Sequence, residues 1–281
     1  MDVTLRQRRL VAAVQKLRDA AGLSLTECAE RAGWSASKLS RAETLQSRLS
    51  GDDIHRLCTS VFNLDRQATD VLVDLARRQR ERGWWQVYGR DMIGDVADLI
   101  ELESDASVER EYSIDLVPGL LQTADYARAV IGAGFPREST ERIGERVEIR
   151  LARQQRLRDG GLDLWVVLDE LALWRPVGGA AVMAAQLDHL AELADHPAVT
   201  LQVLPREVQA HAACGAPFRL FTLGTENYAY VDNLRGGSVI DDPTEVALYL
   251  DVWQRVSAVA SDFARSVRSV AQAATAYREE E

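Results

Sequence analysis

The chain has 281 residues, of which 47% are apolar, and it carries a formal net charge of −10 at pH 7. No apolar run approaches 18 residues and the first residues lack the apolar core of a secretory signal, so we expect a cytoplasmic protein without a membrane span. The three cysteines, Cys28, Cys58 and Cys214, form no CxxC pair and are too few for a disulfide framework, so we expect inert thiols, no structural metal and no cofactor.

The first predicted elements are two amphipathic helices separated by a glycine. Apolar residues recur every three or four positions over residues 5–20, which predicts a helix that stops near Gly22. Ser24 and Glu27 form a capping box, S-x-x-E, that starts a second helix, and Gly33 then turns the chain. If a third helix follows this turn, the second and third helices form a helix-turn-helix, which is two helices joined by a tight turn that contains glycine.

That third helix is expected to begin at Ser35, and amphipathic patterns over residues 50–62 and 65–82 predict two more helices. The sequence therefore predicts an all-α domain of five helices over residues 1–82. The third helix leaves on its outer face Ala36, Ser37, Ser40 and Arg41.

The charge is divided unevenly between this domain and the remainder. Residues 1–82 hold 15 Lys and Arg against 11 Asp and Glu, a balance of +4, whereas residues 83–281 hold 18 against 32, a balance of −14. Such asymmetry suggests that the first domain meets a polyanion. Screening over about 8 Å at physiological salt lets a local basic face act despite a distant acidic domain.

Two segments of the first domain resemble a known class of protein. The pattern L-R-x-x-A-G-L-S-x-x-x-x-A-x-x-A-G followed by W-S-x-S-K-L-S-R-x-E resembles the phage-repressor (Cro/CI, XRE) class of helix-turn-helix domains. The resemblance implies that the third helix enters the major groove of double-stranded DNA. An ordinary solvated helix face is the alternative. By the class pattern, base-facing positions are Ala36, Ser37 and Arg41, backbone positions are Lys38, Ser40 and Thr44, and Ser35 and Arg48 complete the candidate DNA-binding set.

The class pattern carries two further expectations. It brings Arg18 and Glu43 together as a structural ion pair. The class usually follows that glutamate with Arg-Gly or Asn-Gly, whereas Thr44-Leu45 stands here, so the third helix is expected to run on and Arg48 to substitute for a backbone contact. For Trp34 we expect packing on the core rather than DNA contact.

The run ARRQRERG, residues 76–83, is predicted to end the first domain as a linker or hinge, with a basic clamp on DNA as the alternative. Residues 83–281 are predicted to form an α+β domain. Pro118-Gly119 in VPGLLQT marks a turn whose leucines form either core or a docking knob. Predicted strands are LDLWVVLDE, VTLQVLP, FRLFTL and NYAYVDN, and helices are expected after Thr123, through RIGERVEIRLARQQRL, after Gly178-Gly179, through PTEVALYLDVWQRV, and from Ser261 or Asp262 to about Tyr277.

The second domain resembles the domain of unknown function that follows the helix-turn-helix in actinobacterial, WhiJ-like regulators. That resemblance implies an antitoxin-like transcriptional regulator, often encoded beside a small acidic partner protein. It rests on the segments LE-x-x-A, V-P-G-L-L-Q-T-x-x-Y-A, R-x-x-R-Q, V-x-L-D-E, G-x-x-x-V-M-x-x-Q-L, VTLQVLP and H-A-x-x-G-x-P-F.

A catalytic function competes with this interpretation. Asp169 and Glu170 are adjacent, so their side chains point in different directions, and no metal-ligand spacing, nucleophile elbow or phosphate-binding glycine loop is present. His211 and Cys214 indicate either a ligand or redox pocket or, as we favour, a connecting loop. The remaining histidines are His55, His189 and His196.

The sequence therefore predicts a DNA-binding transcriptional regulator rather than an enzyme, with no catalytic residue. Because one helix contacts only a few base pairs, we expect a homodimer. We expect the acidic domain to bind a small co-encoded protein or a small-molecule effector, and the alternative is a ligand-processing or enzymatic domain tethered to a DNA-binding module.

Overall fold

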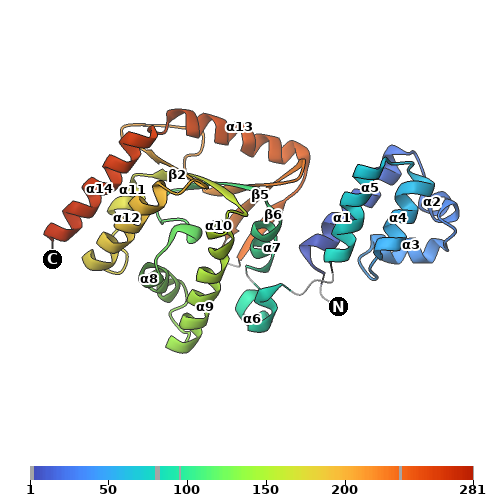
Figure 1. The fold of residues 1–281 in the computed structure, drawn as a ribbon, viewed down its shortest axis with the longest axis horizontal. Helices are drawn as coiled ribbons and strands as arrows, with labels where there is room; N and C mark the ends of the chain where they lie inside the picture. Colours follow the sequence, from blue (N-terminus) through green and yellow to red (C-terminus); the bar gives the residue numbers. More distant parts are fainter. Residues whose placement is uncertain (1–2, 80–82, 95, 234–235, 281) are drawn as a thin grey trace. The chain divides into compact units, whose positions relative to one another are not determined.

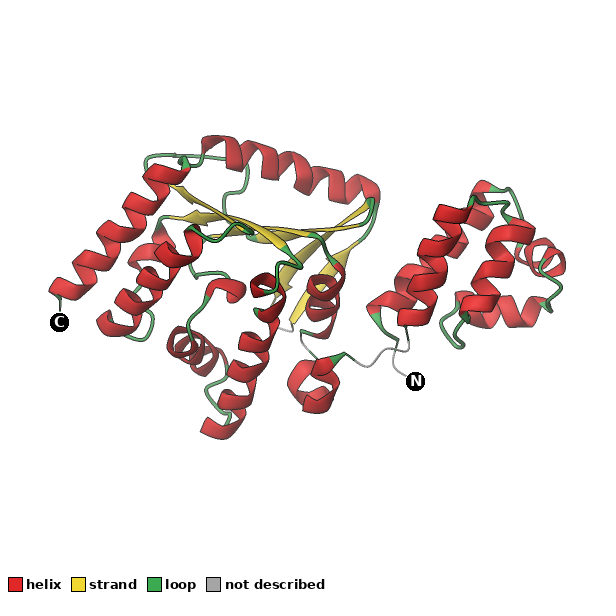
Figure 2. Ribbon diagram, in the orientation of Figure 1, coloured by secondary structure: helices red, strands yellow, loops and turns green. Residues whose placement is uncertain are grey.

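A computed structural model describes residues 3–79, 83–94, 96–233 and 236–280, and the chain divides into two units, Met1–Val87 and Tyr88–Glu281. The first is helical and the second has a mixed sheet with helices, which confirms the predicted order of an all-α and an α+β domain (Figures 1 and 2). The predicted boundary between residues 82 and 83 adjoins residues 80–82, which lie outside the described residues.

Side-chain caps define where the helices of the first unit begin. Ser24, Ser35 and Ser50 each accept a hydrogen bond from the backbone N–H three residues on, as the predicted capping chemistry requires. The helices are α1 (Leu5–Ala20), α2 (Leu25–Arg31), α3 (Ala36–Glu43), α4 (Gly51–Arg56), the π-helical η1 (Leu57–Val61), α5 (Arg66–Arg78) and the 3₁₀ helix η2 (Trp84–Tyr88).

An apolar core holds these helices together. Leu39 of α3, Ile54 of α4 and Cys28 of α2 have no exposed surface and belong to one cluster, and Trp34 packs against its edge. Burial raises the pKa of the Cys58 thiol to about 11, so this side chain is a neutral apolar group at physiological pH.

The expectation that the third helix runs on past Glu43 is wrong. α3 ends at Glu43, and Leu45 adopts a left-handed conformation with φ of 61°. The carbonyl of Arg41 then accepts hydrogen bonds from the N–H groups of Gln46 (2.8 Å) and Ser47 (3.0 Å), which closes the helix end. A leucine thus takes the backbone conformation that glycine adopts most easily.

The second unit is built on a six-stranded sheet with the order β3-β2-β1-β4-β5-β6. β1, β2 and β3 are parallel, whereas β4, β5 and β6 continue the sheet in antiparallel pairs from β1. Two of the strands, the first and the last, have no counterpart among the predicted strands. The strands are β1 (Val108–Ser113), β2 (Asp163–Asp169), β3 (Val199–Leu204), β4 (Phe218–Leu223), β5 (Glu226–Asn233) and β6 (Gly236–Ile240).

Helices cover both faces of this sheet. In Figure 1, α13 (Pro243–Val259) crosses one face, and α7 (Ala97–Asp105) and α9 (Thr140–Arg153) lie on the other. Leu120 and Leu121 of VPGLLQT are buried, so they belong to the core. The other helices are α6 (Arg90–Ile93), the 3₁₀ helix η3 (Gly119–Leu121), α8 (Ala124–Gly134), α10 (Gln155–Arg158), α11 (Leu171–Trp174), α12 (Ala180–Ala194) and α14 (Phe263–Glu279).

Candidate nucleic-acid interface

The turn between α2 and α3 fixes the direction of α3. Gly33 has φ of 70°, the Trp34 N–H donates to the Ala29 carbonyl at 2.8 Å, and Ser35 caps α3 by accepting from the Lys38 N–H. Leu39 faces the core with no exposed surface. The opposite side of α3 is therefore turned to solvent.

Ser37 and Arg41 lie on this solvent side, one helical turn apart and both exposed. Arg41 Nη1 donates to Ser37 Oγ at 3.3 Å, which is the only hydrogen bond of that guanidinium within the described part of the chain. Ser35 and Thr44 are exposed at the two ends of the helix, and Ala36 and Ser40 are half-buried beside them. These six residues form a contiguous polar face along α3.

The other two predicted contact residues point to neighbouring helices. Lys38 Nζ lies 2.5 Å from Asp53 Oδ1 and 4.0 Å from the centre of the Trp34 ring. Although burial raises the pKa of Asp53, hydrogen bonds from Lys38 and Ser50 lower it below its usual value. The pattern Ser50-x-x-Asp53 is a second capping box, so the carboxylate could have been found in the sequence, but its contact with Lys38 could not.

Arg48 lies beyond the end of α3. Its Nε donates to Gln7 Oε1 on α1 at 3.4 Å. The side chain therefore rests against the first helix.

Arg18 and Glu43 join the end of α1 to the end of α3. Arg18 Nε lies 2.8 Å from Glu43 Oε1 and Nη2 lies 3.2 Å from Oε2, while Nη1 donates to the Leu23 carbonyl at 3.1 Å. The two side chains are 17% and 8% exposed. Hydrogen bonding by Glu43 outweighs burial and raises the pKa of Arg18, so this bidentate pair anchors the helix that carries Arg41.

Buried charges distinguish the second unit. Arg153 of α9 donates to both carboxylate oxygens of Glu103 on α7, at 2.6 and 2.8 Å, and each side chain is 5% exposed. Arg219 of β4 lies 3.0 Å from Glu111 of β1. The first pair joins two helices and the second joins two strands. The charges of both pairs act on Glu109, and these five side chains form an ionic network.

Glu109 of β1 sits in this network without a close partner. It has no exposed surface, neither carboxylate oxygen has a hydrogen bond within the described residues, and the Nε of Arg219 is 3.7 Å away. Burial, with the neighbouring charges of Glu103 and Glu111, raises the pKa of Glu109 well above its usual value. The carboxyl group therefore loses its proton less readily in the folded unit than in the unfolded chain.

The residues considered and set aside as catalytic candidates make local contacts, and Asp169, His211 and Cys214 all lie near Tyr112. Asp169 Oδ1 accepts from the Leu171 N–H, and Glu170 Oε2 accepts from the Arg206 N–H. His211 Nε2 lies 3.4 Å from the Tyr112 hydroxyl, and the His211 N–H lies 3.4 Å from the sulfur of Cys214, which is exposed.

The comparisons with known proteins separate the same two regions. A family model described as "Domain of unknown function (DUF5753)" matches residues 96–272, and a model described as "Helix-turn-helix domain" matches residues 9–72. No curated protein and no solved structure gives a significant match. Within the described ranges, no helix is both long and apolar enough to cross a bilayer.

Proposed function

The chain belongs to the DUF5753 family, whose model covers more than half of it, and it carries a DNA-binding helix-turn-helix domain; from this premise we propose a sequence-specific transcriptional regulator of the XRE, WhiJ-like type. In this proposal α3 enters the major groove, and the acidic domain controls DNA occupancy by binding a small co-encoded protein or a small-molecule effector.

The observation that carries the proposal is the exposed Ser37–Arg41 pair on a helix whose other side is fixed in the core. An arginine can donate two hydrogen bonds to the O6 and N7 atoms of guanine, and a serine one turn earlier can donate to a neighbouring base. Exchanging Ser37 for a base costs Arg41 little free energy, because the hydrogen bond between Arg41 and Ser37 is exposed and long.

The roles of the remaining site residues follow from their surroundings. We propose that Ser35 and Ser40 donate to phosphate oxygens, that Thr44 does so by releasing the Ser40 carbonyl, to which its hydroxyl donates at 2.8 Å, and that Ala36 lies against a base edge. Lys38 and Arg48 are already engaged with Asp53 and Gln7 respectively. We therefore assign them a smaller share of the affinity than Arg41.

We further propose that the regulator acts as a homodimer. One helix contacts only a few base pairs, and two half-sites spaced by about 34 Å give the affinity and specificity that a regulator needs. The acidic balance of residues 83–281, 18 Lys and Arg against 32 Asp and Glu, makes direct DNA contact by that domain unfavourable. A tenfold effector response requires about 1.4 kcal/mol of coupling between the effector and DNA sites.

The substitution Arg41→Ala tests the proposed interface. We expect it to weaken binding to a selected operator by about 1–3 kcal/mol and to relax preference at one base position, because only that base loses its two donors. The matched control is Arg66→Ala, which removes the same charge from an exposed site of the same unit. Retained affinity and base preference in Arg41→Ala, measured over a salt titration, would contradict the assignment.

Deleting residues 84–281 tests the role of the second domain. We expect the shortened protein to keep its base preference and to lose any response to the small co-encoded protein or the small-molecule effector. A truncated protein that still responds, or substrate turnover by the second domain, would contradict the regulatory role.

A further inference from the structure

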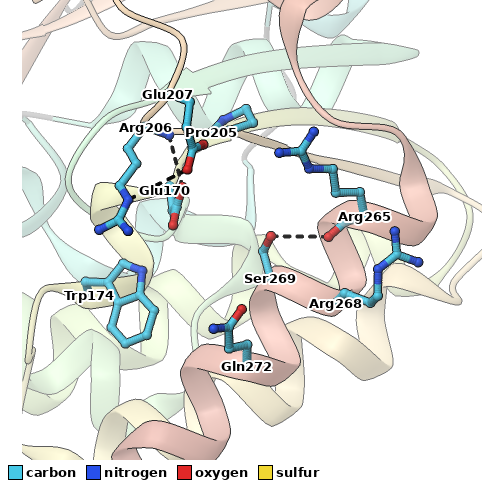
Figure 3. A pocket seen from close by; sticks show the side chains of 9 residues that line it. All are labelled: Glu170, Trp174, Pro205, Arg206, Glu207, Arg265, Arg268, Ser269 and Gln272. Atoms are coloured by element: carbon cyan, nitrogen blue, oxygen red, sulfur yellow. Dashed lines mark hydrogen bonds and ion pairs between the residues drawn. The ribbon is translucent and has the colours of Figure 1, made fainter.

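A cavity of about 430 Å³ opens at the carboxyl ends of the parallel strands β2 and β3. This volume suits a small organic molecule. Figure 3 shows the side chains that line the cavity: Glu170, Trp174, Pro205, Arg206, Glu207, Arg265, Arg268, Ser269 and Gln272.

Two arginines of the cavity have no acidic partner in the part of the chain that the structure describes. Arg265 and Arg268 lie one turn apart on α14, and within the described residues neither guanidinium makes a hydrogen bond or ion pair. Arg206, in contrast, lies 3.9 Å from Glu207. Residues 83–281 hold 32 acidic side chains against 18 basic ones, so two unpartnered guanidiniums at one cavity are a local reversal of sign. They attract an anion.

The acidic side chains at the cavity do not pair with Arg265 or Arg268. Glu170 Oε2 accepts only the backbone N–H of Arg206 at 2.9 Å and so keeps its charge, whereas Glu207 lies 3.9 Å from the side chain of Arg206. Three arginines and two glutamates line the cavity, which leaves a balance of +1. Neither carboxylate neutralises Arg265 or Arg268. The charge presented to a ligand is therefore positive on the side of α14.

The indole ring of Trp174 lies across the cavity from Arg265 and Arg268. Trp174 of α11 is 43% exposed, and its ring is tilted by 33° against Tyr277, with ring centres 6.4 Å apart. In Figure 3, Trp174 and Arg206 lie on one side and Arg265 and Arg268 rise from α14 on the other, with Ser269 and Gln272 between them. An exposed indole beside polar groups favours a flat heteroaromatic ring over a hydrocarbon.

We propose that this cavity binds a small organic anion in which one phosphate or carboxylate contacts Arg265 and Arg268 and a flat heteroaromatic ring stacks on Trp174. The hydroxyl of Ser269 and the amide of Gln272 supply hydrogen bonds to the atoms between these two ends. The identity of this anion as the effector rests on the proposed function, whereas its binding does not.

The experiment measures binding to the full-length protein by isothermal titration calorimetry, without DNA. The probes are AMP, adenosine 5′-carboxylate, adenosine and inorganic phosphate, which separate the ring from the charge and phosphate from carboxylate. We expect AMP or the carboxylate to bind with a Kd below about 1 mM and adenosine and phosphate to bind at least about tenfold more weakly. The better of the two adenosine anions identifies the head group.

The double variant R265Q/R268Q is expected to weaken binding of the preferred anion by at least about tenfold. Its matched control is R128Q/R255Q, which also removes two exposed helical arginines, each paired with an acid on its own helix. Trp174→Leu is expected to weaken the binding of AMP by a larger factor than the binding of inorganic phosphate. Because Arg265 and Arg268 are exposed and unpaired, R265Q/R268Q should keep the melting temperature of the parent protein.

Failure of both adenosine anions to bind the parent protein would overturn the proposal, as would equal affinity in R265Q/R268Q and the parent. A loss of affinity in R128Q/R255Q equal to that in R265Q/R268Q would also overturn it, since the effect would then be one of net charge. Repeating the DNA-binding assay with the bound anion separates the two proposals. Anion binding that leaves DNA occupancy unchanged supports the site and contradicts its role as the effector site.

Discussion

The two units bury different kinds of polar group. In the first unit the buried polar side chains are mainly neutral, Gln7, Thr69 and Gln79, with Arg6 as a buried cation, and the Arg18–Glu43 pair keeps 17% exposure on the arginine. The second unit encloses charges: Glu103 and Arg153 are 5% exposed, and Glu109 has no exposed surface. The free energy of unfolding of the helical unit thus depends mainly on apolar burial, whereas that of the α+β unit also depends on charge pairing and on pH.

Removing Arg153 should produce the largest difference between the units. Arg153→Met leaves Glu103 buried without its bidentate partner, and we expect the second unit to lose about 3–5 kcal/mol of unfolding free energy while the first is unchanged. Hydrogen exchange in full-length protein, followed separately in the two units, measures the effect. The double variant Glu103→Leu/Arg153→Met should recover much of the loss, because it removes both charges. A loss below about 1 kcal/mol in the single variant would contradict burial of the pair.

The pair in the first unit should give a smaller loss. Glu43→Gln removes the carboxylate from Arg18, whose partial exposure lets water replace some of the lost interaction, so we expect about 1–3 kcal/mol. The control is Asp70→Asn, which breaks the Arg66–Asp70 pair, whose side chains are both largely exposed, and should cost under about 0.5 kcal/mol. Urea denaturation of each variant, with hydrogen exchange to assign the unit, would contradict us if the two substitutions cost the same.

The pH response of the second unit provides a third test. The folded-state pKa of Glu109 is raised above its ordinary value of 4.5, so the folded state retains a proton that the unfolded state loses, and stability contributed by this group falls as pH rises above about 4.5. Glu109→Gln should match the stability of the parent near pH 4 and exceed it by a growing amount as pH rises above 4.5. Denaturation midpoints across this range measure the difference, and a constant difference at every pH would contradict a raised pKa.

The smallest expected effect concerns the end of α3. Leu45→Gly should stabilise the first unit by about 0.5 kcal/mol, because relief of the left-handed conformation outweighs the lost side-chain contacts and the greater freedom of glycine when unfolded. Leu45→Ala keeps the backbone strain and loses the same contacts, so it should be destabilising. If both variants change the melting temperature equally, backbone strain at this position is absent.

The sequence predicted features that depend on neighbouring residues. Ser24, Ser35 and Thr123 start helices because each side-chain oxygen accepts a backbone N–H within its own first turn. The exposed position of Ser37 and Arg41 follows equally from the helical period, since Leu39 and Ala42 must face the core.

Features set by distant contacts could not be predicted. The strand β1 has the sequence VEREYS, whose charged residues are typical of a solvated segment, yet Glu109 and Glu111 point inward because Arg219 and Arg153 arrive from later parts of the chain. The Lys38–Asp53 contact depends in the same way on how α4 packs beside α3. Leu45 was missed because a leucine gives no signal of a left-handed backbone.

The position of β1 at the centre of the sheet also sets the order in which the two units can be completed during synthesis. Its residue Val108 pairs with Thr222, so the central antiparallel ladder cannot close until the chain as far as β4 has left the ribosome. The helices of the first unit belong to a compact unit of their own within Met1–Val87. At about 5–20 residues per second, translation from the end of the first unit at Val87 to Thr222 takes on the order of ten seconds. For that interval each nascent chain carries a complete helix-turn-helix without the domain that we propose to control it.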